Sequence, residues 1–202
     1  WTTVAPSAIA FDGYAPPQAL DTNGIGQVLP AFVAAARRAL QAGFKAVEIH
    51  AAHGYLLHQF LSPLSNLRTD EYGGSFANRI RLPRAVIAAV RKAWPQHLPL
   101  LVRLSATDWV DGGWDAEQTI DLCRLLKTDG VDLIDVSTGG LVPGAKIPAG
   151  PGFQVPFATR IRTEAGLPVA AVGLITDAAQ AEAIVAGGEA DLVLVGREIL
   201  RN

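Results

Sequence analysis

The stretch EIHAAHGYLLHQFLSPLSNLRTDEYGGSFANR at residues 48–79 follows directly from a short apolar run and opens with three side chains that can carry chemistry. The run at residues 46–50, AVEIH, has the length and β-branched content of a buried strand. His50, His53 and Tyr55 then fall within six residues. The stretch therefore predicts a strand whose C-terminal end leads into a polar turn with candidate functional groups.

Four more runs of the same kind follow along the chain. They are short and rich in Val, Ile and Leu, as expected of strands buried on both faces of a parallel sheet. These runs lie at residues 100–105, 131–137, 169–172 and 191–195. Helical patterns precede and separate the strands at residues 29–42, 77–94, 116–129, 154–165 and 178–186. The alternation predicts an α/β fold with right-handed crossovers.

Polar or small residues follow all five predicted strands. This favours a TIM (β/α)8 barrel, which builds its site at the C-terminal ends of the strands, over a doubly wound sheet with one switch point. Five strands do not close an eight-stranded barrel, and an open piece would leave two edges unpaired. Residue 1 is Trp and the chain contains no Met. We therefore expect residues 1–202 to form one domain, the last five βα units (strands four to eight) of a barrel that lacks its N-terminal strands and its C-terminal tail here.

The composition argues against nucleic acid and membranes as binding partners of this protein. Half of the 202 residues are apolar, and 17 basic against 19 acidic residues give a net charge of −2. That balance provides no field for nucleic acid or an anionic membrane surface, and no apolar run approaches the roughly 18 residues of a membrane span. The single cysteine, Cys123, excludes a disulfide within the chain and is typical of a cytoplasmic protein.

The cluster of His50, His53 and Tyr55 admits three interpretations. Two imidazole N–H groups that converge on one carbonyl oxygen would stabilise the negative charge that develops there, and Tyr55 could then protonate a carbanion or enolate. The three side chains could instead pack and hydrogen-bond within the loop. A zinc site with His58 as a further ligand would indicate a metal-dependent barrel hydrolase.

Two glycine turns indicate phosphate binding. Gly173 and Leu174 follow the fourth predicted strand, and Gly196 and Arg197 follow the fifth. As strands seven and eight of a barrel, these would place backbone N–H groups and a positive charge at a common phosphate site. Arg103 lies in a strand made largely of Leu and Val, so it needs a partner. That partner is either a structural ion pair or a heterocycle that gains negative charge on reduction.

The segment at residues 68–79 combines mixed charges with two adjacent glycines. We interpret it as an ordered loop held by ion pairs.

Taken together, these motifs resemble the old yellow enzyme family of FMN-dependent ene-reductases, in particular its bacterial branch of NADPH dehydrogenases and xenobiotic reductases. The resemblance covers essentially the whole chain, and the stretch at residues 48–75 is highly specific. The other motifs that carry it are VAPSAIAF, LVRLSATD, GVDLIDVSTGG, AVGLIT and LVLVGRE.

The resemblance implies a role for each motif. His50 and His53 match the pair that binds the oxygen of the substrate's activating carbonyl, and Tyr55 matches the proton donor. The residues that match FMN contacts are Arg103, Ser137, Thr138, Gly139, Gly173, Leu174, Gly196 and Arg197.

The resemblance further implies a flavoprotein oxidoreductase that uses FMN and NAD(P)H to reduce the C=C bond of α,β-unsaturated carbonyl compounds. The implied partners are small enones and enals, together with either a homo-oligomer or the missing portion of the barrel. Nucleic acid and membranes are not among them. A metal-dependent hydrolase using His50, His53 and His58, and a non-catalytic partial barrel, remain the alternative hypotheses.

Overall fold

A five-stranded parallel sheet forms the centre of the computed structural model, which describes residues 2–201. Its strands lie across the sheet in chain order: β3 (Val47–Ala51), β4 (Leu100–Ser105), β5 (Leu133–Ser137), β6 (Val169–Ala171) and β7 (Leu192–Val193). Because the order never reverses, the sheet has no switch point of the doubly wound type. It is the arrangement expected for one arc of a (β/α)8 barrel, and the predicted alternation of strands and helices is confirmed.

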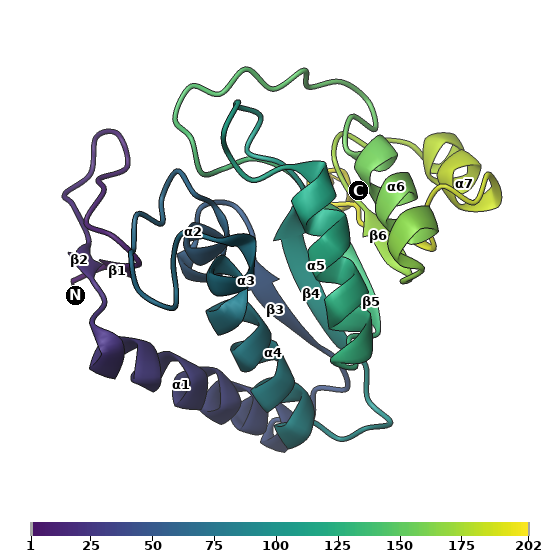
Figure 1. Cartoon of the computed structure of the whole chain (residues 1–202). Coiled ribbons are helices and arrows are strands. Elements are labelled where there is room, and N and C mark those ends of the chain that lie inside the picture. The colour runs from purple at the N-terminus through teal and green to yellow at the C-terminus, as the bar shows by residue number, and fades with distance from the viewer. Residues whose placement is uncertain (1, 202) are drawn as a thin grey trace.

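Helices join the strands and lie along one face of the sheet (Figure 1). The connections contain α2 (Leu56–Leu61), α3 (Phe76–Arg79), α4 (Arg81–Ala93), α5 (Ala116–Thr128), α6 (Val155–Ala165) and α7 (Ala178–Ala186). The long helix α1 (Thr22–Gln41) precedes the sheet and packs on α4, as α5 packs on α6. A short parallel pair, β1 (Val4–Ala5) and β2 (Gln18–Ala19), begins the described chain, and a 3-10 helix (Ile199–Arg201) ends it. Within residues 2–201, none of these helices combines the length and apolarity that crossing a membrane requires.

Two of the predicted helices differ from the observed ones by more than one residue. Helix α1 begins at Thr22 rather than at residue 29, because the carboxylate of Asp21 caps it by accepting the Gly24 N–H at 2.7 Å. The single helix expected at residues 77–94 is divided at Ile80 into α3 and α4.

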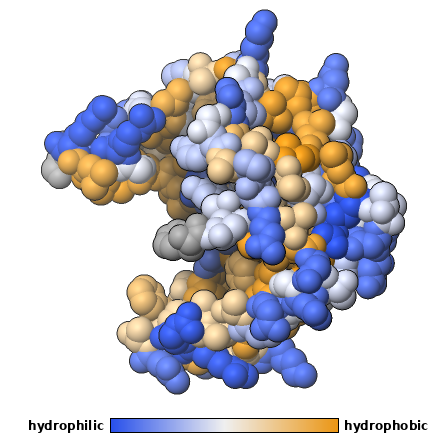
Figure 2. All heavy atoms as spheres, turned by 90° about the vertical axis from the view of Figure 1, so that its left-hand side faces the viewer, coloured by the Kyte–Doolittle hydropathy of each residue, from blue (hydrophilic) through white to orange (hydrophobic). Residues whose placement is uncertain are grey.

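The register of the sheet places one row of residues on a common face. His50 pairs with Arg103, Arg103 with Asp135, Asp135 with Ala170, and Ala170 with Leu192. Residues paired in this way point to the same side of a sheet. This face is the one without helices, and Leu192 on it is 50% exposed. Figure 2 shows that the molecule is hollowed on one side.

The opposite face of the sheet packs against the helices and forms the core. Val102, Leu104, Ile134, Val136 and Ala171 point that way and are almost inaccessible to solvent. The burial of these side chains is the main source of stability for the helix-covered half of the sheet. The hydrophobic core therefore lies between the sheet and its helices.

Candidate active site

The predicted catalytic trio is gathered at the C-terminal end of β3. His50 is part of the strand, and the chain then turns through His53 and Gly54 to Tyr55, the N-cap of α2. His53 and Gly54 both have left-handed backbone conformations, with φ of 57° and 75°, and together they form a tight turn. The ring centroids of His50 and His53 are 5.2 Å apart, as are those of His50 and Tyr55. The structure therefore brings the three side chains together, and Tyr55 is 63% exposed.

The β3–α2 turn is held against the loop that follows β5. A Cβ added to Gly54 would lie 2.5 Å from the carbonyl oxygen of Gly140. In turn, a Cβ added to Gly140 would lie 2.6 Å from the Cα of His53. Only glycine at both positions permits this close backbone approach, so the position of His53 depends on β5 as well as on β3.

Serine hydroxyls from the neighbouring strands fix both ends of His53. Its backbone N–H donates to Ser105 Oγ at 3.0 Å, and its Nε2 lies 2.7 Å from Ser137 Oγ. The Ser105 hydroxyl itself donates to the carbonyl of Gly139 at 2.8 Å. The backbone of His53 is therefore held by a residue of β4 and its ring by a residue of β5.

His58 has a structural role, which removes the third ligand of the metal hypothesis. Its Nδ1 accepts the Gly54 N–H at 2.9 Å, and its Nε2 lies 3.0 Å from Oδ1 of the fully buried Asp108. Both ring nitrogens are thus engaged inside the fold, and the side chain is inaccessible. Residues 2–201 contain no group of three or more His, Cys, Asp or Glu side chains placed to hold a metal ion. The interpretation of His58 as a ligand was wrong.

Burial and a nearby positive charge keep the two site histidines neutral. Burial lowers the pKa of His53 to about 4, and the positive charge of Arg103 adds to the effect. The same two causes, in the same order, lower the pKa of His50. Near pH 7 each ring therefore carries one N–H and can donate one hydrogen bond.

Arg103 lies on the same face of the sheet as His50 and forms an ion pair. Its Nε is 3.1 Å from Oδ2 of the buried Asp135 on β5, so the structure contains an ion pair of the kind that the sequence left as one alternative. The contact lacks hydrogen-bond geometry, and both carboxylate oxygens of Asp135 have no hydrogen-bond partner within residues 2–201. Burial raises the pKa of Asp135 to about 7, an effect that Arg103 opposes and Glu48 increases.

The two glycine turns are placed side by side, at the ends of the paired strands β6 and β7. Gly173 has φ of 116°, and a Cβ there would lie 2.6 Å from the Gln154 side chain. Leu174, with φ of 51°, is 38% exposed. Around Gly196 a Cβ would meet nothing within 4 Å, and Arg197 is exposed. The backbone after β7 is therefore accessible, whereas Gly173 is also required for packing.

The residues after β5 are engaged within the protein. Ser137 and Thr138 are buried and contact Gln154 through their hydroxyls, while the N–H of Gly139 donates to the carbonyl of Thr107 at 2.8 Å. Gln154 is the residue that the sequence analysis missed. It lies at the end of a long loop just before α6, where no local pattern distinguishes it from other loop residues.

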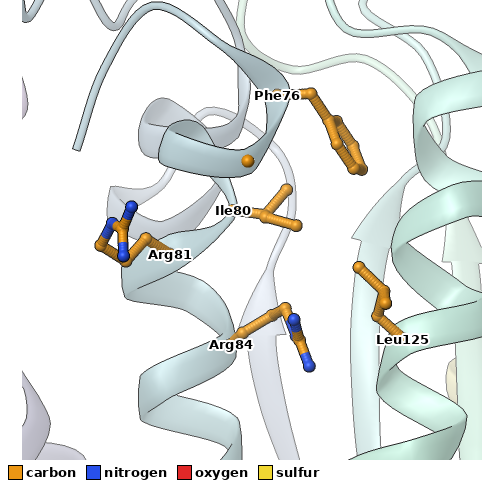
Figure 3. Close-up of a pocket in the computed structure, with 6 residues that line it drawn as sticks. Phe76, Ile80, Arg81, Arg84 and Leu125 are labelled. Carbon is orange, nitrogen blue, oxygen red and sulfur yellow. The ribbon is translucent and has the colours of Figure 1, made fainter. Parts of the chain in front are cut away.

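Two further features lie outside the site. The segment at residues 68–79 is an ordered loop, as predicted: Arg68 pairs with Asp70 and donates to the carbonyl of Pro6 at 3.1 Å. A surface pocket of about 330 Å³ is lined by Phe76, Ala77, Ile80, Arg81, Arg84 and Leu125, as Figure 3 shows. It lies in the helical layer, and Arg84 there is occupied by two hydrogen bonds to Asp129.

Known proteins are similar to this chain in sequence or in fold. An NADPH dehydrogenase of Listeria monocytogenes serotype 4b (strain CLIP80459) is 52% identical over 200 residues, which cover 98% of this chain and 58% of the relative. Morphinone reductase superposes with a TM-score of 0.79 at 31% identity, covering 98% of this chain and 56% of that one. The old yellow enzyme homologue from Zymomonas mobilis gives 0.77 at 31% identity, with 98% and 57% covered.

These matches confirm the predicted resemblance and the predicted barrel arc. The chain spans about 58% of the length of the curated relative. The model of the NADH:flavin oxidoreductase / NADH oxidase family matches residues 5–202. The chain therefore belongs to the NADH:flavin oxidoreductase / NADH oxidase family, the family of the old yellow enzymes.

Proposed function

We propose that this chain carries the catalytic end of an FMN-dependent NAD(P)H oxidoreductase that reduces the C=C bond of α,β-unsaturated aldehydes and ketones. The observation that carries the proposal is the arrangement of two neutral imidazoles with an exposed phenol beside them. Membership of a flavin oxidoreductase family supports it independently.

The two histidines supply the groups that activate the substrate. Each neutral ring donates one N–H, and two such donors at the rim of the sheet can bind one carbonyl oxygen. Their hydrogen bonds strengthen as negative charge moves onto that oxygen, so they stabilise the transition state more than the ground state. The β-carbon of the enone becomes electron-poor as a result.

Tyr55 supplies the proton. Its phenol lies next to His50 and is open to solvent, so a bound substrate can reach it. A phenol with an ordinary pKa of about 10 readily protonates a carbanionic α-carbon, which is far more basic. We therefore assign Tyr55 as the general acid.

We propose that the open face of the sheet binds the flavin. Arg103 is a partly exposed cation there, and it makes no hydrogen bond through Nε within residues 2–201. Beyond the C-terminal end of β7, the space around Gly196 and the exposed Arg197 suit a phosphate group. In this proposal Arg103 would hold the ring system, and the turns after β6 and β7 would hold the phosphate. FMN, when bound, supplies the hydride after reduction by NAD(P)H.

A flavin absorbance spectrum tests the cofactor part of the proposal. The purified chain is mixed with FMN, passed through gel filtration and scanned from about 300 to 550 nm, a range that covers the visible flavin bands. We expect the flavin bands to elute with the protein. A colourless protein after FMN addition would show that this chain alone is only the scaffold of the site.

Substitution of Tyr55 by Phe tests the catalytic part. We expect Tyr55→Phe to retain FMN and to slow cyclohexenone reduction by roughly 100-fold or more, since loss of a general acid typically has that effect. Steady-state turnover with NADPH measures it. Tyr14→Phe removes the hydroxyl of another exposed tyrosine, outside the site, and should leave the rate unchanged. Equal rates for the two variants would remove Tyr55 from the mechanism.

A further inference from the structure

A short hydrogen-bond chain connects His53 to the loop before α6. Ser137 Oγ lies 2.7 Å from His53 Nε2 and 3.3 Å from Gln154 Oε1. Gln154 Oε1 also accepts the hydroxyl of Thr138 at 2.7 Å. Ser137, Thr138 and Gln154 are all buried, so water does not substitute for their hydrogen-bond partners.

The orientation of the Gln154 amide follows from its surroundings. Its Nε2 donates to the backbone carbonyl of Val172 at 2.9 Å. A carbonyl accepts and never donates, so the NH2 group must face Val172 and the oxygen must face the two hydroxyls. Gln154 makes no capping hydrogen bond to the helix that it precedes, and its side chain serves this chain of contacts instead.

The single hydroxyl proton of Ser137 has two possible acceptors. Gln154 Oε1 is the more distant one, and it already accepts the short hydrogen bond from Thr138. His53 Nε2 is closer, at 2.7 Å, a distance typical of an O–H donor rather than of an N–H donor, for which about 2.9–3.0 Å is usual. The geometry therefore favours donation from Ser137 to His53.

We propose that Ser137 is a positioning residue that holds the neutral His53 ring in the Nδ1–H tautomer, leaving Nδ1–H as the donor for the substrate's carbonyl oxygen. The inference rests on the proposed function and deepens it. Thr138 contributes indirectly, because its hydroxyl occupies one of the two lone pairs of Gln154 Oε1 and so makes that oxygen a poorer competitor for the Ser137 proton.

Because the other contacts of His53 fix its position, the tautomer decides whether its ring presents an N–H or a lone pair to the substrate. Its backbone is pinned by Ser105 and by the close approach of Gly140, so the ring cannot compensate by moving as a whole. Burial keeps the ring neutral at pH 7, since it lowers the pKa of His53 to about 4. A neutral ring has one N–H only, and the wrong tautomer would present a lone pair to the substrate oxygen.

Nitrogen NMR of the histidine rings tests the proposal directly. The chain contains four histidines, and His53→Asn identifies the His53 signals. At pH 7.5, long-range proton–nitrogen spectra of the labelled full chain should show His53 protonated at Nδ1. In Ser137→Ala the protonated nitrogen should change to Nε2, the tautomer that an unconstrained histidine prefers.

Two further variants keep the test decisive if Ser137→Ala does not fold. Ser137→Thr retains the hydroxyl and should retain the Nδ1–H tautomer. Thr138→Val frees Gln154 Oε1 and should shift His53 partly towards Nε2–H. Nε2 protonation in the unmodified chain, or an unchanged His53 tautomer in both Ser137→Ala and Thr138→Val, would overturn the proposal.

The NMR result also separates this inference from the proposed function. The tautomer is read without flavin or turnover, so a chain with the Nδ1–H tautomer that fails to bind FMN would contradict only the proposed cofactor site. A chain that binds FMN and reduces cyclohexenone with His53 protonated at Nε2 would contradict only the role of Ser137.

Discussion

At the scale of single residues, backbone strain is concentrated at the candidate site. Within residues 2–201, three residues other than glycine have positive φ: His53, Trp109 and Leu174. Each lies in the loop that follows a strand of the sheet, after β3, β4 and β6 respectively. Such conformations cost free energy and persist where surrounding contacts impose them, which is common at functional sites. The strained positions therefore lie at the edge of the sheet that we propose for catalysis.

The lowered pKa of His53 predicts an acid sensitivity of the fold. Between about pH 6.5 and 4 the unfolded chain binds a proton at His53 that the folded chain does not, so the free energy of unfolding falls as the pH falls through this window. His53→Asn removes this contribution and tolerates the left-handed backbone. Relative to the unmodified chain, its stability should increase from pH 7 to pH 4.5 in urea unfolding. Parallel stability curves would contradict the buried, neutral state of His53.

The raised pKa of Asp135 predicts the opposite dependence. Between about pH 4 and 7 the folded chain keeps a proton at Asp135 that the unfolded chain releases, so this contribution to stability is lost as the pH rises. Asp135→Asn resembles the protonated form at every pH. Its stability relative to the unmodified chain should therefore increase from pH 5 to pH 8, measured by the same urea titration. A relative stability that decreases over that range would show that the ion pair with Arg103 outweighs burial.

At the scale of elements, the site depends on the contact between two loops. The turn after β3 and the loop after β5 meet at Gly54 and Gly140, where backbone atoms leave no room for a side chain. Strand pairing does not set this contact, because β3 and β5 are separated by β4. The position of His53 therefore depends on the loop after β5, although β4 lies between β5 and the strand that precedes His53.

Alanine substitution of two glycines in the same loop tests this coupling. Gly140 and Gly144 both have positive φ, 88° and 69°, but a Cβ meets His53 Cα at 2.6 Å only at Gly140, and nothing within 4 Å at Gly144. In both variants an alanine must adopt a left-handed backbone conformation, which costs free energy. The difference between their free energies of unfolding therefore measures the steric clash at Gly140. Gly140→Ala should be less stable than Gly144→Ala by about 1–3 kcal/mol in urea unfolding. Equal stabilities would mean that the loops do not touch in solution.

At the scale of the whole molecule, the two faces of the sheet differ in burial. The helix-covered face contains the core, whereas the face that bears His50 and Arg103 also bears the half-exposed Leu192. The outer strands β3 and β7 each pair on one side only within residues 2–201. We propose that further βα units or a second copy of the chain cover this face.

Two leucine substitutions test how the faces differ. Leu104 in β4 points to the helices and is 1% exposed, whereas Leu192 in β7 is 50% exposed. Leu104→Ala should lower the free energy of unfolding by about 2–5 kcal/mol, as for other buried leucines. Leu192→Ala should cost less than about 1 kcal/mol because little burial is lost. Similar losses for both would indicate that the open face is covered in solution.

Much of the fold followed from the sequence because its signals are local. Strand β4 and helix α7 have the predicted bounds, and the other four strands of the sheet were placed within two residues at each end. Helix α1 was predicted too short because its first turns contain Gly24 and Gly26, which are poor helix formers and hide the helical pattern. The trio of His50, His53 and Tyr55 was identifiable because its members are close in the chain.

Contacts between distant segments were decided only by the tertiary structure. The sequence alone determined the βα alternation, the candidate trio of His50, His53 and Tyr55, and the family resemblance, since periodicity and short motifs depend on neighbouring residues. It left open whether Arg103 would form an ion pair and did not identify Asp135 as the partner. It also missed that His58 faces Asp108 and that Ser137 connects His53 to Gln154. Gln154 and Ser137 are 17 positions apart in the sequence, and Ser137 and His53 are 84 positions apart. Only the packing of the parallel strands and their loops brings such groups within hydrogen-bond distance. Local sequence preferences do not specify which distant residues meet.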